Sequence, residues 1–189
     1  AKDIQKKVTH EFNGKKINGT MDVKINDKVW DIKSASPYSF DNKFGENGGF
    51  DAIKKDDAFG YIAQGFMYGE ADTSDFGGWI VINKSTGEWC MTEVPLSDDS
   101  KEATVQKVEE KIEKLEADEP FERCFTDNEE YFYKKPTGNR VLGITCSFCP
   151  YKKPCWGNKL HYLPQQQSKG KNPRWVWYTE INNPRPDED

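Results

Sequence analysis

Two aspartates and a lysine carry the chemistry that this sequence suggests most directly. Asp22 stands in a Gly-x-x-Asp pattern, and Asp31 and Lys33 form an Asp-x-Lys pattern shortly after it. Splitting a phosphodiester puts negative charge on the attacking and leaving oxygens, and divalent ions held by carboxylates can stabilise both. Mg²⁺ and Mn²⁺ prefer such oxygen ligands. These residue types therefore predict a metal-dependent phosphodiesterase site, with a plain surface hairpin and its ion pair as the alternative.

The elements that must position these residues begin with a β-hairpin. Two runs rich in Val, Ile and Trp, Ile17–Ile25 and Lys28–Ala35, are joined by an Asn-Asp dipeptide that tolerates the positive φ of a tight turn. Both carboxylates would then project near one edge of a sheet. Lys33, two positions beyond Asp31, would share its face of the strand, where its ammonium can orient or help ionise a water.

A helix is expected after the hairpin. From Phe50 to about Asp72 apolar residues recur at helical spacing, which predicts a helix packed on the sheet. Gln64 and Tyr68 are one turn apart on this helix and flank its apolar stripe. They could therefore present an amide and a phenol together to the carboxylate site.

Three motifs in this order, on strand, strand and helix, resemble the PD-(D/E)xK nucleases of the RecB type, which include the CRISPR adaptation exonucleases and many phage exonucleases. The resemblance covers roughly residues 8 to 94 and the cysteine-bearing end of the chain. It implies an α/β, restriction-endonuclease-like core with a mixed central sheet flanked by helices, and hydrolysis of DNA with Mg²⁺ or Mn²⁺. The residues that it implies are Asp22, Asp31 and the Ile32 carbonyl as metal ligands, Lys33 as the catalytic lysine, and Gln64 and Tyr68 as organisers of the site or of the DNA.

One departure from this family concerns a histidine. Its members usually carry a histidine metal ligand on a helix before the first strand, whereas this chain begins only a few residues before an expected strand over Val8–Phe12. His10 and Glu11 lie within that strand, and either is a substitute ligand or a plain strand residue. The start at Ala1 rather than Met also raises the question of a missing N-terminal segment.

Cysteine spacing supplies a second constellation. Cys146, Cys149 and Cys155 form a C-x2-C-x5-C array with stiffening prolines, and Cys124 lies upstream. Without a signal peptide to indicate an oxidising compartment, disulfides are the poorer explanation. Closely spaced thiolates suit a metal or a cluster, with Cys124 as the fourth ligand. Cys90 sits in an alternating strand and is expected to be a small buried residue.

The array is similar to the 4Fe-4S site that closes the C-terminal part of many RecB-like nucleases. Their distant cysteine usually lies near the N-terminus, where this chain has none. The alternative is a zinc site completed by His161. Either metal would act as a staple, because its binding free energy becomes folding free energy.

Composition limits the remaining function classes. At 189 residues the chain suits one domain with a small metal-bound appendage, and 35% hydrophobic residues exclude a membrane span. We expect a cytoplasmic protein of a bacterial or phage-infected cell. A net charge of −5 is unexpected for a DNA-binding protein, but Lys and Arg are enriched in the C-terminal third, where aromatic residues could stack unpaired bases. The residues expected to touch nucleic acid are Ser34, Ser36, Lys152, Lys153 and Arg174.

The rest of the chain completes the expected frame. Residues 34–49 read as a loop that could cover the substrate, Trp79–Asn83 and Glu88–Val94 as a second hairpin, and the segment from Asp99 to before Pro120 as a solvated helix. Arg174–Ile181 reads as a strand with both tryptophans on one face. The expected organisation is a nuclease core over 1–120, a cysteine lobe with a closing strand packed on the core over 121–181, and a disordered tail over 182–189.

The sequence thus predicts a metal-dependent DNA exonuclease acting on single strands or duplex ends, with a recombination or replication protein as a candidate partner. Two alternatives stay open. One is a catalytically weak or inactive nucleic-acid-binding or scaffolding subunit of the same fold. The other is a zinc-ribbon interaction protein with an incidental hairpin.

Overall fold

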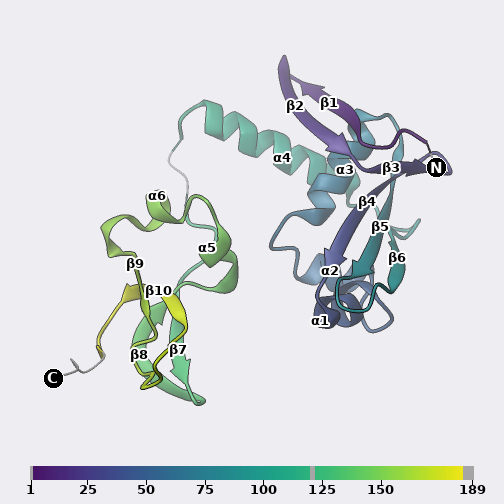
Figure 1. Cartoon of the computed structure of the whole chain (residues 1–189). Helices are drawn as coiled ribbons and strands as arrows, with labels where there is room; N and C mark the ends of the chain where they lie inside the picture. Colours follow the sequence, from purple (N-terminus) through teal and green to yellow (C-terminus); the bar gives the residue numbers. More distant parts are fainter. Residues whose placement is uncertain (1, 120–121, 185–189) are drawn as a thin grey trace. The chain divides into compact units, whose positions relative to one another are not determined.

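The chain folds into two compact units, Ala1–Glu119 and Pro120–Asp189, and each is described by itself. The computed structural model in Figure 1 describes residues 2–119 and 122–184. The first unit contains β1 (Lys6–Phe12), β2 (Lys15–Met21), β3 (Val23–Ile25), β4 (Lys28–Ala35), α1 (Pro37–Ser39), a π-helical turn (Phe40–Phe44), α2 (Phe50–Lys55), α3 (Tyr61–Ala71), β5 (Asp75–Asn83), β6 (Trp89–Glu93) and α4 (Lys101–Glu116). The second contains β7 (Asn128–Phe132), β8 (Lys135–Val141), α5 (Ile144–Phe148), α6 (Lys152–Trp156), a 3₁₀ turn (Gly157–Lys159), β9 (His161–Pro164) and β10 (Trp175–Glu180).

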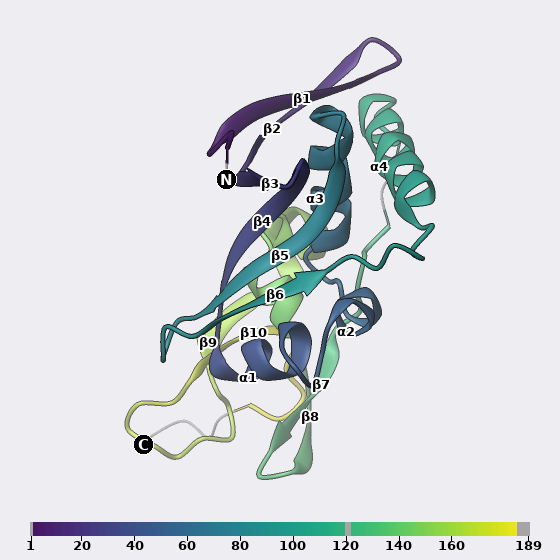
Figure 2. The same cartoon turned by 90° about the vertical axis from the view of Figure 1, so that its right-hand side faces the viewer.

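A four-stranded mixed sheet forms the centre of the first unit, as Figure 2 shows. Its strands lie in the order β3-β4-β5-β6, with β4 and β5 parallel and the outer pairs antiparallel. Parallel neighbours need a crossover connection, and the helices between β4 and β5 provide it. The expected mixed sheet with flanking helices is therefore confirmed, as is the hairpin that β5 and β6 form.

The strand expected over Ile17–Ile25 is wrong as one strand, because Asp22 interrupts it. Before Asp22, β2 pairs with β1 in a separate two-stranded sheet; after it, β3 pairs with β4 across the expected turn. Asn26 and Asp27 in that turn have φ of 50° and 60°, the left-handed geometry that a two-residue hairpin needs. At this break the Asp22 carboxylate accepts the backbone N–H of Ile32, so a side-chain hydrogen bond takes the place of backbone pairing between the strands.

The single helix expected from Phe50 to Asp72 is also wrong, since two helices, α2 and α3, fill that segment. The Asp57 carboxylate accepts the N–H groups of Tyr61 and Ile62 at 2.7 and 2.9 Å and so starts α3 afresh. Gly60 has φ of 70° just before the first helical residue, which breaks the helical path. The apolar spacing persists through the break because α2 and α3 both pack on the sheet.

The segment 34–49, expected to be a loop, contains helical turns instead. Ser36 accepts a hydrogen bond from the Ser39 N–H, and Pro37 occupies the first position of α1. The π-helical turn that follows buries Phe44, whose carbonyl accepts the Thr92 hydroxyl at 2.6 Å. This segment is therefore fastened to β6 at one point.

The core of the first unit lies between the sheet and the helices α2 and α3. Met21, Val29, Ile53, Trp79 and Val81 are completely shielded from solvent. The predicted solvated helix is present as α4, and none of its residues is buried. Its apolar stripe therefore reaches the core only at its edge, mainly through the partly buried Val105.

The second unit is built on its own four-stranded sheet, in the order β7-β8-β10-β9. The strand predicted over Arg174–Ile181 is β10, and it pairs with β8 and β9. Both tryptophans do lie on one face, because the Tyr162 ring contacts Trp175 and Trp177 at centroid distances of 5.3 and 4.5 Å.

Part of the expected disordered tail belongs to the second unit. The N–H groups of Asn182 and Asn183 donate to Asn139 Oδ1 at 3.0 and 2.7 Å, so the expectation of disorder is wrong for these two residues. Residues 185–189 lie outside the described part of the chain. In the described ranges, no helix has both the length and the apolar character that crossing a membrane requires.

Candidate active site

The two aspartates lie beside each other where the sheet begins. Asp31 is in β4 and only 4% exposed, and Asp22 is the half-buried residue between β2 and β3. Asp22 Oδ2 accepts the Ile32 N–H and Asp22 Oδ1 accepts Gln5 Nε2, both at 2.7 Å. Because N–H and C=O of one strand residue point to the same edge, the Ile32 carbonyl also faces the Asp22 side of β4.

Lys33 connects this pair of carboxylates to the helix α3. Its ammonium lies 2.9 Å from Asp31 Oδ2, 2.9 Å from Gln64 Oε1 and 4.9 Å from the centroid of the Tyr61 ring. The approach to Asp31 is that of an ion pair without hydrogen-bond angles, so Asp31 Oδ2 is a buried oxygen with no hydrogen-bond partner in the described residues. The Lys33 ammonium is therefore the one cation that the described residues place against this oxygen.

Gln64 and Tyr68 continue the network along α3. Gln64 Nε2 lies 3.2 Å from the Tyr68 hydroxyl, while the Oε1 of the same amide accepts from Lys33. Tyr68 in turn covers Gly19: a Cβ at Gly19 would lie 2.5 Å from Tyr68 Cε1. The three motifs predicted from the sequence therefore meet in one continuous network.

The electrostatics of the site favour a bound cation. Burial raises the pKa of Asp31, the Lys33 ammonium opposes this rise, and the neighbouring Asp22 carboxylate adds to it. Two carboxylates and one ammonium give the site a net negative charge, and Asp31 is largely shielded from solvent. Carboxylate and carbonyl oxygens are the ligand type that Mg²⁺ and Mn²⁺ prefer, so the donor chemistry of Asp22, Asp31 and the Ile32 carbonyl fits such an ion.

His10 does not join the aspartates. Its Nε2 lies 2.8 Å from Glu109 Oε1 on α4, and its ring stacks on Phe12. Within residues 2–119 and 122–184, no three His, Cys, Asp or Glu side chains are placed so that they could hold a metal ion. In this structure His10 thus ties the β1–β2 hairpin to α4.

Two contributors to the site were not anticipated from the sequence. Gln5 precedes β1 and gave no signal, because its contact with Asp22 depends on the hairpin folding back. Tyr61 lies one turn before Gln64 on α3, so helical spacing alone could have placed its ring beside Lys33.

All five cysteines are free, and four of them gather in the second unit. Burial raises the pKa of Cys146, and the nearby thiolates of Cys149, Cys155 and Cys124 raise it further. The Cys149 N–H donates to the Cys146 carbonyl at 3.2 Å, which folds the array into a tight turn. Cys90, in contrast, lies in β6 of the first unit and packs against the core, but it is only partly buried, less than expected.

The residues expected to touch nucleic acid are divided between the two units. Ser34 and Ser36 are exposed at the end of β4 and at the start of α1, and Lys153 and Arg174 are exposed in the second unit. The Lys152 ammonium donates to the Cys149 carbonyl at 2.9 Å and lies 5.4 Å from the centroid of a Trp177 ring.

Comparison of the chain with protein-family models, with curated proteins and with solved structures finds no match.

Proposed function

We propose that the first unit holds the active site of a metal-dependent DNA nuclease, an exonuclease that hydrolyses phosphodiesters at single strands or duplex ends. The supporting observation is the unbroken network from Asp22 and Asp31 through Lys33 to Gln64 and Tyr68, with one buried carboxylate oxygen left without a hydrogen-bond partner. A surface hairpin with an incidental ion pair would need neither the burial of Asp31 nor the amide that holds Lys33.

In this proposal Asp22, Asp31 and the Ile32 carbonyl hold Mg²⁺ or Mn²⁺. When bound, the ions offset the negative charge that develops on the attacking and leaving oxygens. Gln64 accepts one N–H of the Lys33 ammonium and so fixes its position, leaving other N–H groups for a phosphate oxygen or a water. Tyr68 fixes the amide of Gln64 from the other side.

The charge distribution supports a nucleic-acid substrate held by the second unit. Residues 120–189 contain eleven Lys and Arg and eight Asp and Glu, a net charge of +3, whereas residues 1–119 contain 16 and 24, a net charge of −8. The rings of Tyr162 and Trp175 are half exposed and lie side by side with Trp177. Aromatic rings beside basic groups suit unpaired bases and the phosphates between them.

The test is cleavage of end-labelled single-stranded and duplex DNA with Mg²⁺, Mn²⁺ or Ca²⁺. Asp31→Ala and Lys33→Ala should each lower the rate by at least about 10²-fold, because each removes a group that contacts the reacting phosphate or its metal. Asp41→Ala and Lys84→Ala make the same charge changes at exposed positions of the first unit and should cleave normally. Full activity of the Asp31 and Lys33 variants would reject the proposal.

One observation favours the non-catalytic alternative, a DNA-binding or scaffolding subunit. His10, the candidate for a third metal ligand, is hydrogen-bonded to Glu109 instead. Under this alternative the protein binds DNA, and no divalent ion produces cleavage at any concentration.

We also propose that Cys124, Cys146, Cys149 and Cys155 hold a metal centre, either a 4Fe-4S cluster or Zn²⁺. The support is the C-x2-C-x5-C spacing and the turn in which the Cys149 N–H donates to the Cys146 carbonyl; in the described residues no three of these side chains are placed as ligands, so metal binding must draw them together. Absorbance and metal analysis of the purified protein distinguish the two: a brown protein with broad visible absorbance contains iron and sulfide, and a colourless one contains zinc. Cys146→Ser should lower both the metal content and the thermal stability of the protein. An equally stable variant that contains no metal would reject the structural role.

A further inference from the structure

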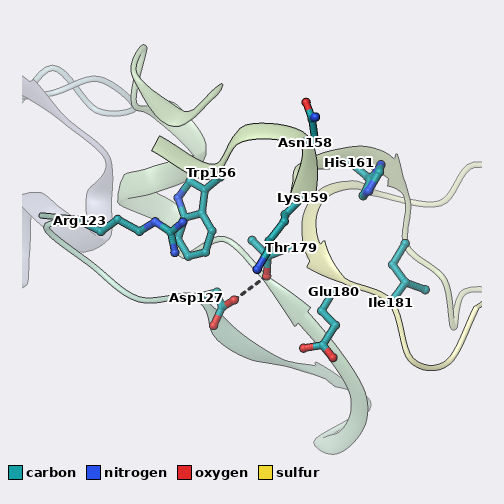
Figure 3. A pocket seen from close by; sticks show the side chains of 9 residues that line it. All are labelled: Arg123, Asp127, Trp156, Asn158, Lys159, His161, Thr179, Glu180 and Ile181. Carbon is teal, nitrogen blue, oxygen red and sulfur yellow. Dashed lines mark hydrogen bonds between the residues drawn. The ribbon is translucent and has the colours of Figure 1, made fainter. Parts of the chain in front are cut away.

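The second unit contains a hollow of about 720 Å³, and of the predicted site residues only His161, the alternative zinc ligand, lines it. Figure 3 shows the Arg123 side chain lying over the Trp156 ring at one side of this hollow, and Lys159 extending toward its middle. The volume falls in the range of small-molecule sites, about 300 to 1,000 Å³. The hollow is therefore large enough for one nucleotide unit of a strand.

Arg123 is held in a fixed orientation at the wall. Its guanidinium carbon lies 4.2 Å from the centroid of the Trp156 ring, and its Nε donates to the Cys155 carbonyl at 3.0 Å. Neither terminal nitrogen has a hydrogen-bond partner in the described part of the chain. A guanidinium that is oriented in this way offers two parallel N–H donors, the geometry that binds an oxyanion in bidentate fashion.

Lys159 supplies a second cation. It is exposed and makes no ion pair with any residue that the structure describes. The acidic groups of the lining do not cancel both cations. Asp127 Oδ2 accepts the Thr179 hydroxyl at 2.6 Å and Oδ1 is ion-paired with Arg140, which also interacts electrostatically with Glu180; Arg123 interacts with Asp127 only at longer range, without an ion pair.

We propose that this hollow binds a phosphate group of a nucleic-acid strand through Arg123 and Lys159. The choice of a polynucleotide rests on the proposed function, but the site itself stands on the two cations, the aromatic wall and the volume. A phosphate satisfies both cations at once, because its unesterified oxygens, two in an internal phosphate and three in a terminal one, can accept the two Arg123 donors and the Lys159 ammonium together. The net charge of the unit, +3 over residues 120–189, favours the approach of such a strand.

The test is the binding of fluorescent 12-nucleotide single strands to the full chain, measured by anisotropy over a series of salt concentrations without added Mg²⁺ or Mn²⁺. Three strands of one sequence carry a 5′-phosphate, a 3′-phosphate or hydroxyls at both ends. Lys159→Ala should weaken binding about tenfold and reduce the slope of log K against log salt by about 0.7, the amount for one lost phosphate contact. Arg123→Lys, which keeps the charge but loses the paired donors, should weaken binding without changing the slope.

Lys135→Ala is the matched control, since Lys135 is exposed in the same unit and does not line the hollow. A preference for a phosphorylated end that both variants lose assigns the site to a terminal phosphate. Equal binding of the three strands, weakened in both variants, assigns it to an internal phosphate. Unchanged binding in both variants, or an equal loss in Lys135→Ala, overturns the proposal.

The outcome is separate from that of the nuclease proposal. Cleavage without any effect of Lys159→Ala on binding would reject the hollow and keep the nuclease. Binding that depends on Lys159, without cleavage, would reject the nuclease and keep the phosphate site in the hollow.

Discussion

Adding one methyl group at Gly19 should disable the site without changing any charge. The Cβ of Gly19→Ala would lie 2.5 Å from Tyr68 Cε1 and 3.3 Å from Tyr68 Cδ1. Ordinary carbon contacts begin near 3.5 Å, so the ring or the strand must move by about 1 Å. Because the Tyr68 hydroxyl holds Gln64, and Gln64 holds Lys33, the displacement is passed to the ammonium.

Two magnitudes follow from this geometry. Overpacking of one methyl group costs about 1–3 kcal/mol in the free energy of unfolding. A 1 Å misplacement near reacting groups can cost about 10²-fold in rate, so we expect kcat/KM for DNA cleavage to fall by about that factor. Gly170→Ala is the control, because its Cβ would meet only Ser168 Oγ, at 3.5 Å.

A double-mutant cycle identifies the route of the effect. If Gly19 acts only by making room for the ring, Gly19→Ala should cost little in a Tyr68→Ala background, where the ring is absent. Denaturant unfolding gives the coupling in stability, and cleavage rates give the coupling in activity. An equal loss in both backgrounds would refute the steric argument.

Three further predictions concern buried charge. Asp31→Asn should abolish cleavage yet raise the melting temperature at pH 7, because burial raises the pKa of Asp31 and its ionised form costs stability as the pH rises past that pKa. Burial alone would raise the pKa of Asp72, but hydrogen bonds from Lys24 and neighbouring donors lower it to about 2. Its stabilisation, about 2 kcal/mol, should be present above pH 4 and lost as the pH falls toward 2, a loss that is absent in Asp72→Asn on acid titration followed by circular dichroism. Tyr178→Phe removes the hydroxyl that donates to the buried Glu130 at 2.6 Å, and should lower the free energy of unfolding by about 1–3 kcal/mol in urea.

Local patterns in the sequence were sufficient for β1, β4, β5, β6 and β10, but they predicted none of β7, β8 and β9. The strand over Lys28–Ala35 and its Asn-Asp turn follow from β-branched residues and from the positive φ that the turn tolerates. The same reasoning brought Gln64 and Tyr68 together, since one helical turn separates them. These features depend on neighbours in the chain, which a sequence displays.

The errors arose where a side chain overrides the local pattern. Asp57 and Gly60 divide the expected helix. An aspartate whose carboxylate accepts the first helical N–H groups, followed by a glycine with positive φ, marks a helix start that the spacing of apolar residues does not reveal. Ser36 with Pro37 likewise marks the start of α1. Contacts such as Gly19 with Tyr68 join residues far apart in the chain, and only the assembled fold reveals them.

The interruption of the strand at Asp22 has a consequence for protein engineering. The chain changes pairing partner at this residue, so the β1–β2 ribbon and the central sheet each keep their own alignment on either side of it. Deleting Ile32 from β4 would place Lys33 next to Asp31 in the chain and so turn their side chains to opposite faces of the strand. Removing two residues from each strand next to the Asn13–Gly14 turn would shorten the ribbon and preserve that alignment. The shortened protein should therefore keep its two carboxylates in place.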